Sequence, residues 1–407
     1  MTDIPSPINP SQRLLCGPGP CNVSPAALAA MQRPLLGHMD PDFVEMLTEV
    51  VSLLRNAWRA SSGLVLPLQS TGTAGMEAGL AHLLEPGDTA IIAVNGFFGR
   101  RMVEIARRWG AEVVAVEADW GEHVANERLL AALDEHPDAR LIAVVHAETS
   151  SGVQHPLAEL GAELRGRDVL LMADCVTSLG GVELDFDGWG IDYAYSCSQK
   201  CVGAPPGMSP VAVSDRALER IEARAGSSLG PRTAGGLPYS LDLLLLRDYW
   251  VKRPMVYHHT APVLNIYALH EALREVAVEG LEARWARHME AGRFIQEQLR
   301  ERGLELLADP EHQLPQLTAV RVPEGVDGKA VQTRILREHG IEIGGGLGPI
   351  APAMWRLGLM GINARVSVAE RLLEALDTVL ETEPAFAASA YPPAAPNRRR
   401  RLTAGGA

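Results

Sequence analysis

Lysine, cysteine and long apolar runs are all scarce in this chain of 407 residues. The five cysteines are an odd number and include no CxxC pair, which argues against a zinc site or a disulfide framework. No stretch approaches the roughly 18 apolar residues of a membrane span, and the N-terminus lacks the basic and apolar regions of a secretory signal. We therefore expect a protein of the reducing cytoplasm with no membrane partner.

Positive charge is also in short supply. The chain has 37 Lys and Arg residues against 50 Asp and Glu residues, so its formal net charge is −13. Nucleic acids attract basic surfaces, and we therefore expect no nucleic-acid partner. The one basic run, residues 398–401, lies at the far end of the chain. We expect residues 384–407, which are rich in Ala and Pro, to form a solvated, disordered tail.

Short apolar strands and helices alternate along the chain from about residue 70. Apolar runs without polar alternation are typical of strands that are covered on both faces. The alternation therefore predicts an α/β fold with a mostly parallel sheet. After Gly303 the pattern changes to that of a smaller α+β unit. The predicted organisation is an N-terminal arm (1–20), a large domain (21–280), a small C-terminal domain (281–383) and the tail.

Residues that follow strands are the candidates for function, because ligands of such sheets bind beyond the carboxyl ends of the strands. Residues 70–75, STGTAG, place small hydroxyl side chains and glycines before a helix, which is a phosphate cradle in principle. Asp174 ends a buried strand, where a carboxylate can pair with a protonated ring nitrogen. Each signal alone also fits an ordinary helix cap or a loop acid.

The scarcity of lysine singles out Lys200. Only Lys200, Lys252 and Lys329 are lysines, whereas 34 residues are arginines. Lys200 follows the predicted strand at residues 193–196 and precedes the segment GAPPG. A buried lysine can lose its proton and act as a nucleophile, and arginine cannot. The retained lysine therefore indicates a need for an amine.

A phosphate cradle, an acid for a ring nitrogen and an amine for a Schiff base are the three features that bind pyridoxal 5'-phosphate. Asp174 and Lys200 are 26 residues apart, and the chain also contains GPGP, NGFFGRR, ETSSGV, SLGG, SQK, APPG, YHHT, IEIGGGLGP and RLGLMG. With these motifs the sequence resembles the class V aminotransferases of fold type I, and within them the alanine–glyoxylate (serine–pyruvate) aminotransferase group. The resemblance extends over most of the chain.

The resemblance implies a role for each matching residue around the cofactor. Lys200 would bind the cofactor covalently and move the proton during the reaction. Asp174 would keep the pyridine nitrogen protonated, so that the ring can accept electrons. Gln199 would reach the phosphate. Three residues of the cradle would bind the phosphate as well: Thr71, Gly72 and Thr73.

Further roles follow from motifs later in the chain. Thr149 would lie near the ring oxygen of the cofactor. Phe98 stands where members of the group often have a tryptophan stacked on the cofactor ring, so the ring contact is kept and the indole N–H is lost. Tyr257 and Thr260 would come from the partner subunit of a homodimer with shared active sites. Arg356 would bind the substrate carboxylate with two parallel hydrogen bonds.

The implied activity is transfer of an amino group from alanine or serine to glyoxylate or pyruvate by a ping-pong mechanism. Three alternatives stay open. They are a ureidoglycine–glyoxylate aminotransferase, a pyridoxamine–pyruvate aminotransferase, and a lyase or desulfurase on the same fold. His38 and Tyr257 disfavour the first of these, and the lack of a cysteine in a Gly/Ser-rich loop after Arg356 disfavours a desulfurase. His38 is either a substrate-binding residue or a packing residue.

Overall fold

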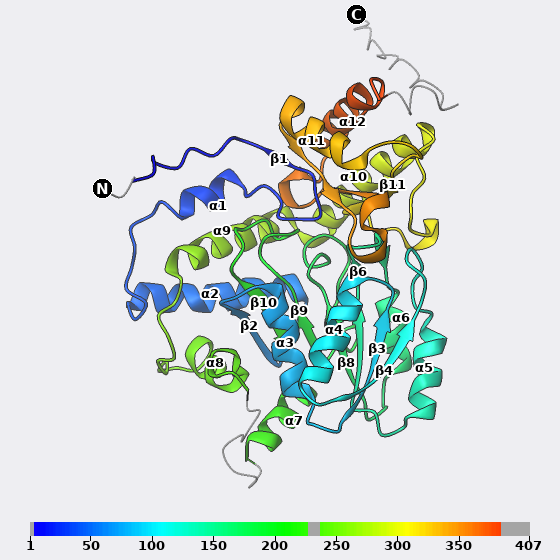
Figure 1. Ribbon diagram of the computed structural model, residues 1–407. Coiled ribbons are helices and arrows are strands. Elements are labelled where there is room, and N and C mark those ends of the chain that lie inside the picture. Colours follow the sequence, from blue (N-terminus) through cyan, green and yellow to red (C-terminus); the bar gives the residue numbers. More distant parts are fainter. Residues whose placement is uncertain (1–3, 227–236, 384–407) are drawn as a thin grey trace, which may run out of the picture.

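The computed structural model describes residues 4–226 and 237–383, and its centre is a seven-stranded sheet (Figure 1). Its strand order is β2-β10-β9-β8-β5-β3-β4. These strands are β2 (Leu64–Leu68), β3 (Thr89–Val94), β4 (Glu112–Glu117), β5 (Leu141–Val145), β8 (Leu170–Asp174), β9 (Tyr193–Tyr195) and β10 (Ser209–Val213). The five strands from β9 to β4 are parallel, and β10 is antiparallel to both of its neighbours. The predicted mostly parallel sheet is therefore confirmed.

The edge strand β2 contains a proline, Pro67, which is unusual inside a strand. Proline cannot donate a hydrogen bond to a neighbouring strand, and it is tolerated at the edge of a sheet. β2 is the edge strand, and Pro67 faces Pro210 of β10. The edge position thus explains how this strand forms.

Helices cover the sheet and enclose the larger hydrophobic core. α3 packs on β9 and β10, α4 packs on β3 and β4, and α2 packs on β2 and α9. The helices of this part are α1 (Pro25–Ala30), α2 (Pro41–Trp58), α3 (Gly72–Leu83), α4 (Phe97–Arg108), α5 (Asn126–Glu135), α6 (Leu157–Glu163), α7 (Asp215–Gly226), α8 (Leu243–Trp250) and α9 (Val263–Glu279), with the 3-10 turn η1 (Tyr239–Leu241). No helix in the two described ranges is long and apolar enough to cross a bilayer.

A second, smaller hydrophobic core lies above the large sheet in Figure 1. It is built on the antiparallel sheet β11-β14-β13, made of Leu317–Arg321, Met354–Gly358 and Gly344–Gly345. The helices α10 (Leu281–Glu301), α11 (Gly328–His339) and α12 (Val366–Leu380) pack around it, and the 3-10 turns η2 (Pro310–His312), η3 (Gly348–Ala353) and η4 (Gly361–Asn363) connect its elements. The expected tail, residues 384–407, lies outside the described residues.

The N-terminal segment belongs structurally to this second core. β1 (Leu14–Leu15) pairs in parallel with β12 (Ile341–Glu342), and Cys16 is buried in the smaller core. The chain then passes back to the large sheet, so residues 16–20 cross between the two parts. A short hairpin of β6 (Ala147–Glu148) and β7 (Val153–Gln154) directly follows the carboxyl end of β5.

Candidate active site

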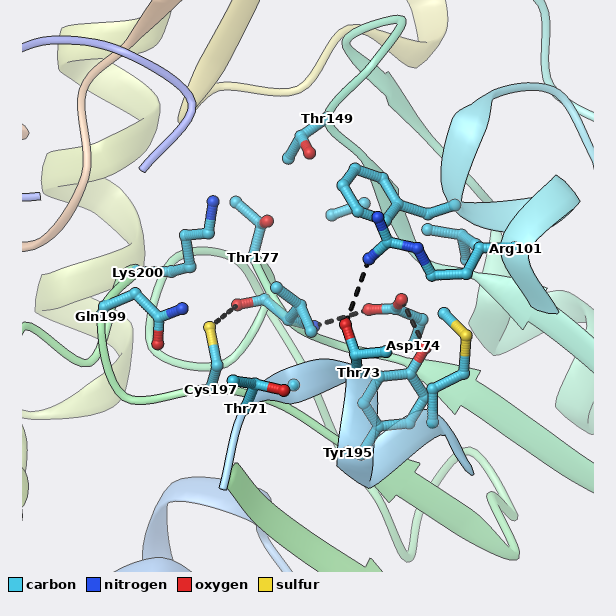
Figure 2. Close-up of a pocket in the computed structure, with 16 residues that line it drawn as sticks. Thr71, Thr73, Arg101, Thr149, Asp174, Thr177, Tyr195, Cys197, Gln199 and Lys200 are labelled. Carbon is cyan, nitrogen blue, oxygen red and sulfur yellow. Dashed lines mark hydrogen bonds between the residues drawn. The ribbon is translucent and has the colours of Figure 1, made fainter. Parts of the chain in front are cut away.

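A cavity of about 180 Å³ lies at the carboxyl ends of the large sheet's strands (Figure 2). The strands and helices that line it are far apart in sequence, because parallel strands bring their carboxyl ends to one edge of the sheet. Eight of the residues predicted from the sequence line this cavity: Thr71, Gly72, Thr73, Phe98, Thr149, Asp174, Gln199 and Lys200. The structure thus brings together most of the predicted set from five separate segments.

The first turn of α3 forms one end of the cavity. The sequence pattern places residues 70–75 before this helix, but the helix already starts at Gly72, with Thr71 as its extended N-cap residue. A Cβ atom on Gly72 would lie 3.0 Å from Val176 Cγ2 and 3.4 Å from Cys197 Cβ, so a side chain there would crowd the cavity wall. Thr71, Gly72 and Thr73 line the cavity, so the positive end of the helix dipole lies at it, as suits an anion.

Two buried polar atoms of the cavity wall have no hydrogen-bond partner within the described chain. They are the side-chain oxygens of Gln199 and Thr177. Leaving a buried polar group unpaired costs about 1–3 kcal/mol, so such groups usually await a ligand or an ordered water. The Thr177 hydroxyl can donate to an anion bound at the α3 N-terminus, whereas the Gln199 oxygen can only accept from a donor group of a ligand or an ordered water.

Asp174 lies at the end of β8 and is held by two hydrogen bonds. Its Oδ2 accepts from the Tyr195 hydroxyl at 2.5 Å, and its Oδ1 accepts from the Val176 N–H at 2.9 Å. Burial raises the pKa of Asp174 to about 6, although both hydrogen bonds act in the opposite direction. The carboxylate is therefore ionised at neutral pH but is poised to pair with a cation in the cavity.

Lys200 follows β9 and is partly buried. Its Nζ donates a hydrogen bond to the carbonyl of Pro18. Burial lowers the pKa of Lys200, and the positive charge of Arg356 lowers it further, whereas nearby thiols act in the opposite direction. A lowered pKa makes the neutral, nucleophilic amine available at a lower pH than for an exposed lysine.

The GPGP motif at residues 17–20 lies against Lys200, which explains why glycine is needed there. Gly19 has φ +108°, and a Cβ atom on it would lie 2.3 Å from Lys200 Nζ. A Cβ atom on Gly358 of β14 would in turn lie 2.0 Å from the carbonyl oxygen of Gly17. The segment thus passes between the lysine and the small sheet, where only glycine allows such close contact.

Arg356 lies on β14 and reaches from the smaller core to the cavity. Its Nε donates to the carbonyl of Gly345 at 2.6 Å, and its Nη1 donates to the carbonyl of Thr149 at 3.3 Å. Burial lowers the pKa of Arg356 to about 10, so the guanidinium stays charged at neutral pH. It borders the cavity beside Thr149 without lining it.

Three of the predicted residues, His38, Tyr257 and Thr260, do not line this cavity. His38 and Thr260 line a separate hollow formed by residues 35–38 and 260–265. The ring of Tyr257 is 5.6 Å from that of His38, and Tyr257 is 57% exposed. Within one chain, the structure therefore does not bring these residues to the cavity.

Four polar residues of the cavity wall were not predicted from the sequence: Arg101, Thr177, Tyr195 and Cys197. Tyr195 pairs in register with Asp174 across β9 and β8, which no local pattern reveals. Thr177 directly precedes the SLGG motif, at residues 178–181. Arg101 ends the NGFFGRR motif, so this motif is the signal that could have identified it.

An α/β fold that brings a partly buried lysine, a carboxylate at a strand end and a helix N-terminus to one cavity defines the fold type I class of pyridoxal-phosphate enzymes. The profile of the family described as "Aminotransferase class-V" matches residues 36–371. The chain belongs to this family and is a transaminase.

Similarity to individual proteins agrees with this assignment. An alanine–glyoxylate aminotransferase of Drosophila melanogaster is 36% identical, over 92% of this chain and 94% of its own length. A (S)-ureidoglycine–glyoxylate transaminase of Bacillus subtilis is 35% identical over 90% of both chains. The crystal structure of an alanine–glyoxylate aminotransferase from Nostoc sp. has a TM-score of 0.87 and 45% identity, covering 93% of this chain and 97% of that one. The predicted family, fold class and enzyme class are confirmed.

Proposed function

We propose that this transaminase uses pyridoxal 5'-phosphate to transfer an amino group from alanine or serine to glyoxylate or pyruvate. The observation that carries the proposal is the shared cavity of Lys200, Asp174 and the first turn of α3, with Arg356 at its border. The bound cofactor would supply an electron sink for the negative charge that develops on the substrate Cα atom. The names of the similar proteins support the choice of small substrates.

Each residue of the cavity has a part in this chemistry. Lys200 would hold the cofactor covalently and, once displaced by the amino acid, move the proton that leaves the substrate Cα. Asp174, fixed by Tyr195, would hold the proton on the ring nitrogen. The cradle of Thr71, Gly72 and Thr73, with Gln199, would bind the phosphate. Phe98 and Thr149 would contact the ring and its oxygen.

Arg356 would orient the substrate through its carboxylate. Its Nε donates to the carbonyl of Gly345 and its Nη1 to the carbonyl of Thr149, and these two hydrogen bonds fix the plane of the guanidinium. The fixed plane suits a planar carboxylate, which guanidinium groups bind with parallel hydrogen bonds. One carboxylate clamp at the border of a small cavity favours small monocarboxylates.

We infer a homodimer in which each chain completes the cavity of the other. The apolar side chains of Leu35, Met39 and Tyr257 are 69%, 50% and 57% exposed, which a second copy would cover. His38, Tyr257 and Thr260 lie beside one another on this surface. In the dimer Tyr257 and Thr260 would reach the partner's phosphate site, and His38 its substrate. A reducing cytoplasm is the proposed compartment, supported by five free, buried cysteines.

The test of the proposed function is a half-reaction panel. Single amino acids are added to the purified, cofactor-loaded protein, and the loss of aldehyde absorbance and the released oxo acid are measured. Alanine and serine should convert the cofactor, and glyoxylate should restore the absorbance. Conversion by ureidoglycine alone would favour the ureidoglycine–glyoxylate activity, and reaction of pyruvate with free pyridoxamine would favour the pyridoxamine–pyruvate activity.

Tyr195→Phe should raise the pH below which cofactor binding weakens. The tyrosine hydroxyl stabilises the ionised form of Asp174, so its removal raises the pKa of Asp174 above about 6. The pairing with a protonated ring nitrogen exists above this pKa and is lost as the pH falls through it. The measurement is the cofactor dissociation constant between pH 5 and 8, roughly the range around this pKa.

Tyr193→Phe is the matched control for this prediction. Tyr193 is also fully buried on β9, but its hydroxyl donates to the carbonyl of Gly75 at 2.8 Å. Its removal should not change the pH below which cofactor binding weakens. An identical pH profile for both variants and the wild type would contradict the role of Tyr195.

A further inference from the structure

Arg101 of α4 extends over the edge of the cavity and joins two of its walls (Figure 2). Its Nη1 donates to Thr73 Oγ1 at 3.2 Å. Its guanidinium carbon lies 5.0 Å from the ring centre of Phe98 and 5.1 Å from that of Phe97. Arg101 thus holds both a hydroxyl of the α3 cradle and the aromatic ring that faces the cofactor space.

The direction of the bond between Arg101 and Thr73 determines what the hydroxyl can do. A guanidinium only donates hydrogen bonds, so Thr73 Oγ1 must accept. The hydroxyl proton is then left to donate to another acceptor. Because Thr73 lies in the first turn of α3, an anion bound at that helix end is such an acceptor.

Arg101 is also the permanent positive charge of the cavity. Among the described residues that line it, Arg101 and Lys200 are the only two with basic side chains. The Lys200 amine would be bonded covalently to the cofactor, and burial lowers its pKa. Arg101 forms no covalent bond with the cofactor, and an arginine side chain keeps its positive charge.

We propose that Arg101 is the positioning residue that makes this site select the phosphorylated cofactor over unphosphorylated pyridoxal. It acts by turning the Thr73 hydroxyl into a donor and by placing a fixed positive charge beside the α3 N-terminus. This inference rests on the proposed function, because it concerns the same cavity. It adds a determinant of cofactor choice that lies outside the cradle motif.

The test compares the binding of two compounds, pyridoxal 5'-phosphate and pyridoxal, to the full-length chain after removal of any bound cofactor. Dissociation constants are measured by absorbance and by equilibrium dialysis for the wild type and Arg101→Gln. The variant should lose about tenfold to a hundredfold in affinity for pyridoxal phosphate, as for one hydrogen bond to a charged group. Its affinity for pyridoxal should change by less than about twofold, because pyridoxal lacks the anion.

Arg100→Gln is the matched control. Arg100 precedes Arg101 on the same helix, but it is exposed and its guanidinium carbon lies 5.8 Å from the ring centre of Trp120, outside the cavity. This variant should bind both compounds as the wild type does. Arg101→Lys should recover part of the selectivity, since it restores the charge without the planar fork.

A double-mutant cycle tests the path through Thr73. If Arg101 acts through this hydroxyl, Thr73→Val should also weaken pyridoxal phosphate selectively, and the double variant should be weaker by less than the sum of the two effects. An equal loss for both compounds in Arg101→Gln would assign Arg101 to the support of Phe98 alone and overturn the inference. An unchanged ratio would overturn it as well. Wild-type protein that binds neither compound would overturn the proposed function together with this inference.

Discussion

Lys200→Ala should lower kcat by roughly 10⁴-fold, the upper range for a positioned group that transfers a proton. Among the described residues that line the cavity shared with Asp174 and the α3 N-terminus, Lys200 is the one with a primary amine. Alanine removes the covalent anchor and the proton carrier together. The measurement is single-turnover conversion with alanine as donor, followed by release of pyruvate.

Two comparisons separate a chemical role from a structural one. Lys252→Ala should keep wild-type activity, because Lys252 is exposed and its Nζ lies 3.4 Å from Asp248 Oδ2, away from the cavity. Small primary amines added to Lys200→Ala should restore part of the rate, since they can enter the space vacated by the side chain and accept the proton. Wild-type turnover in Lys200→Ala would contradict the assignment.

Arg356→Ala should lower kcat/KM by roughly 10²- to 10³-fold for every amino acid substrate, the scale of two lost charge-assisted hydrogen bonds. The effect should be common to all donors, because each carries the same α-carboxylate. Arg356→Lys should recover only part of the loss, since an ammonium group cannot form two parallel hydrogen bonds. The measurement is kcat/KM for alanine and serine in parallel.

Arg321→Ala is the control for this second prediction. Arg321 lies on β11 of the same small sheet, and its Nε donates to Glu305 Oε1 at 2.7 Å near the surface. Its removal should leave kcat/KM unchanged. Thermal unfolding of all variants shows whether the loss of the Gly345 and Thr149 contacts of Arg356 destabilises the fold. Equal kcat/KM in Arg356→Ala and the wild type would remove Arg356 as the carboxylate clamp.

The part of the site that the sequence could predict is the part with local signals. Asp174 directly ends a strand and Lys200 closely follows one, so their place at the edge of the sheet follows from the order of strands and helices. The scarcity of lysine then distinguished Lys200 from other basic residues. Their catalytic roles stay predictions, as do those of the cradle residues.

The rest of the site depends on contacts between distant segments. Tyr195 reaches Asp174 because β9 and β8 pair in one particular register. The GPGP segment meets Lys200 because β1 is fixed to β12 in the smaller core. Gly72, the first residue of α3, lies close to Val176 and Cys197, which are about a hundred residues or more away in sequence, so no local pattern reveals this contact.

Three predicted residues, His38, Tyr257 and Thr260, lie outside the cavity of their own chain. His38, Tyr257 and Thr260 gather on one surface, which a single chain cannot connect to the cavity. Sequence resemblance suggested that Tyr257 and Thr260 cross to a second copy, and the exposed side chains around them support this proposal. In the proposed homodimer these contacts would lie between two chains, so the structure of one chain does not contain them.

Borohydride reduction of the cofactor-loaded protein, followed by peptide mass mapping, tests the central claim most directly. The chain offers only three lysines, so the outcome is unambiguous. The proposed function predicts that the reduced cofactor is recovered on the peptide that contains Lys200, with none on the peptides of Lys252 and Lys329. Recovery on either of those two lysines, or on no lysine, would contradict it.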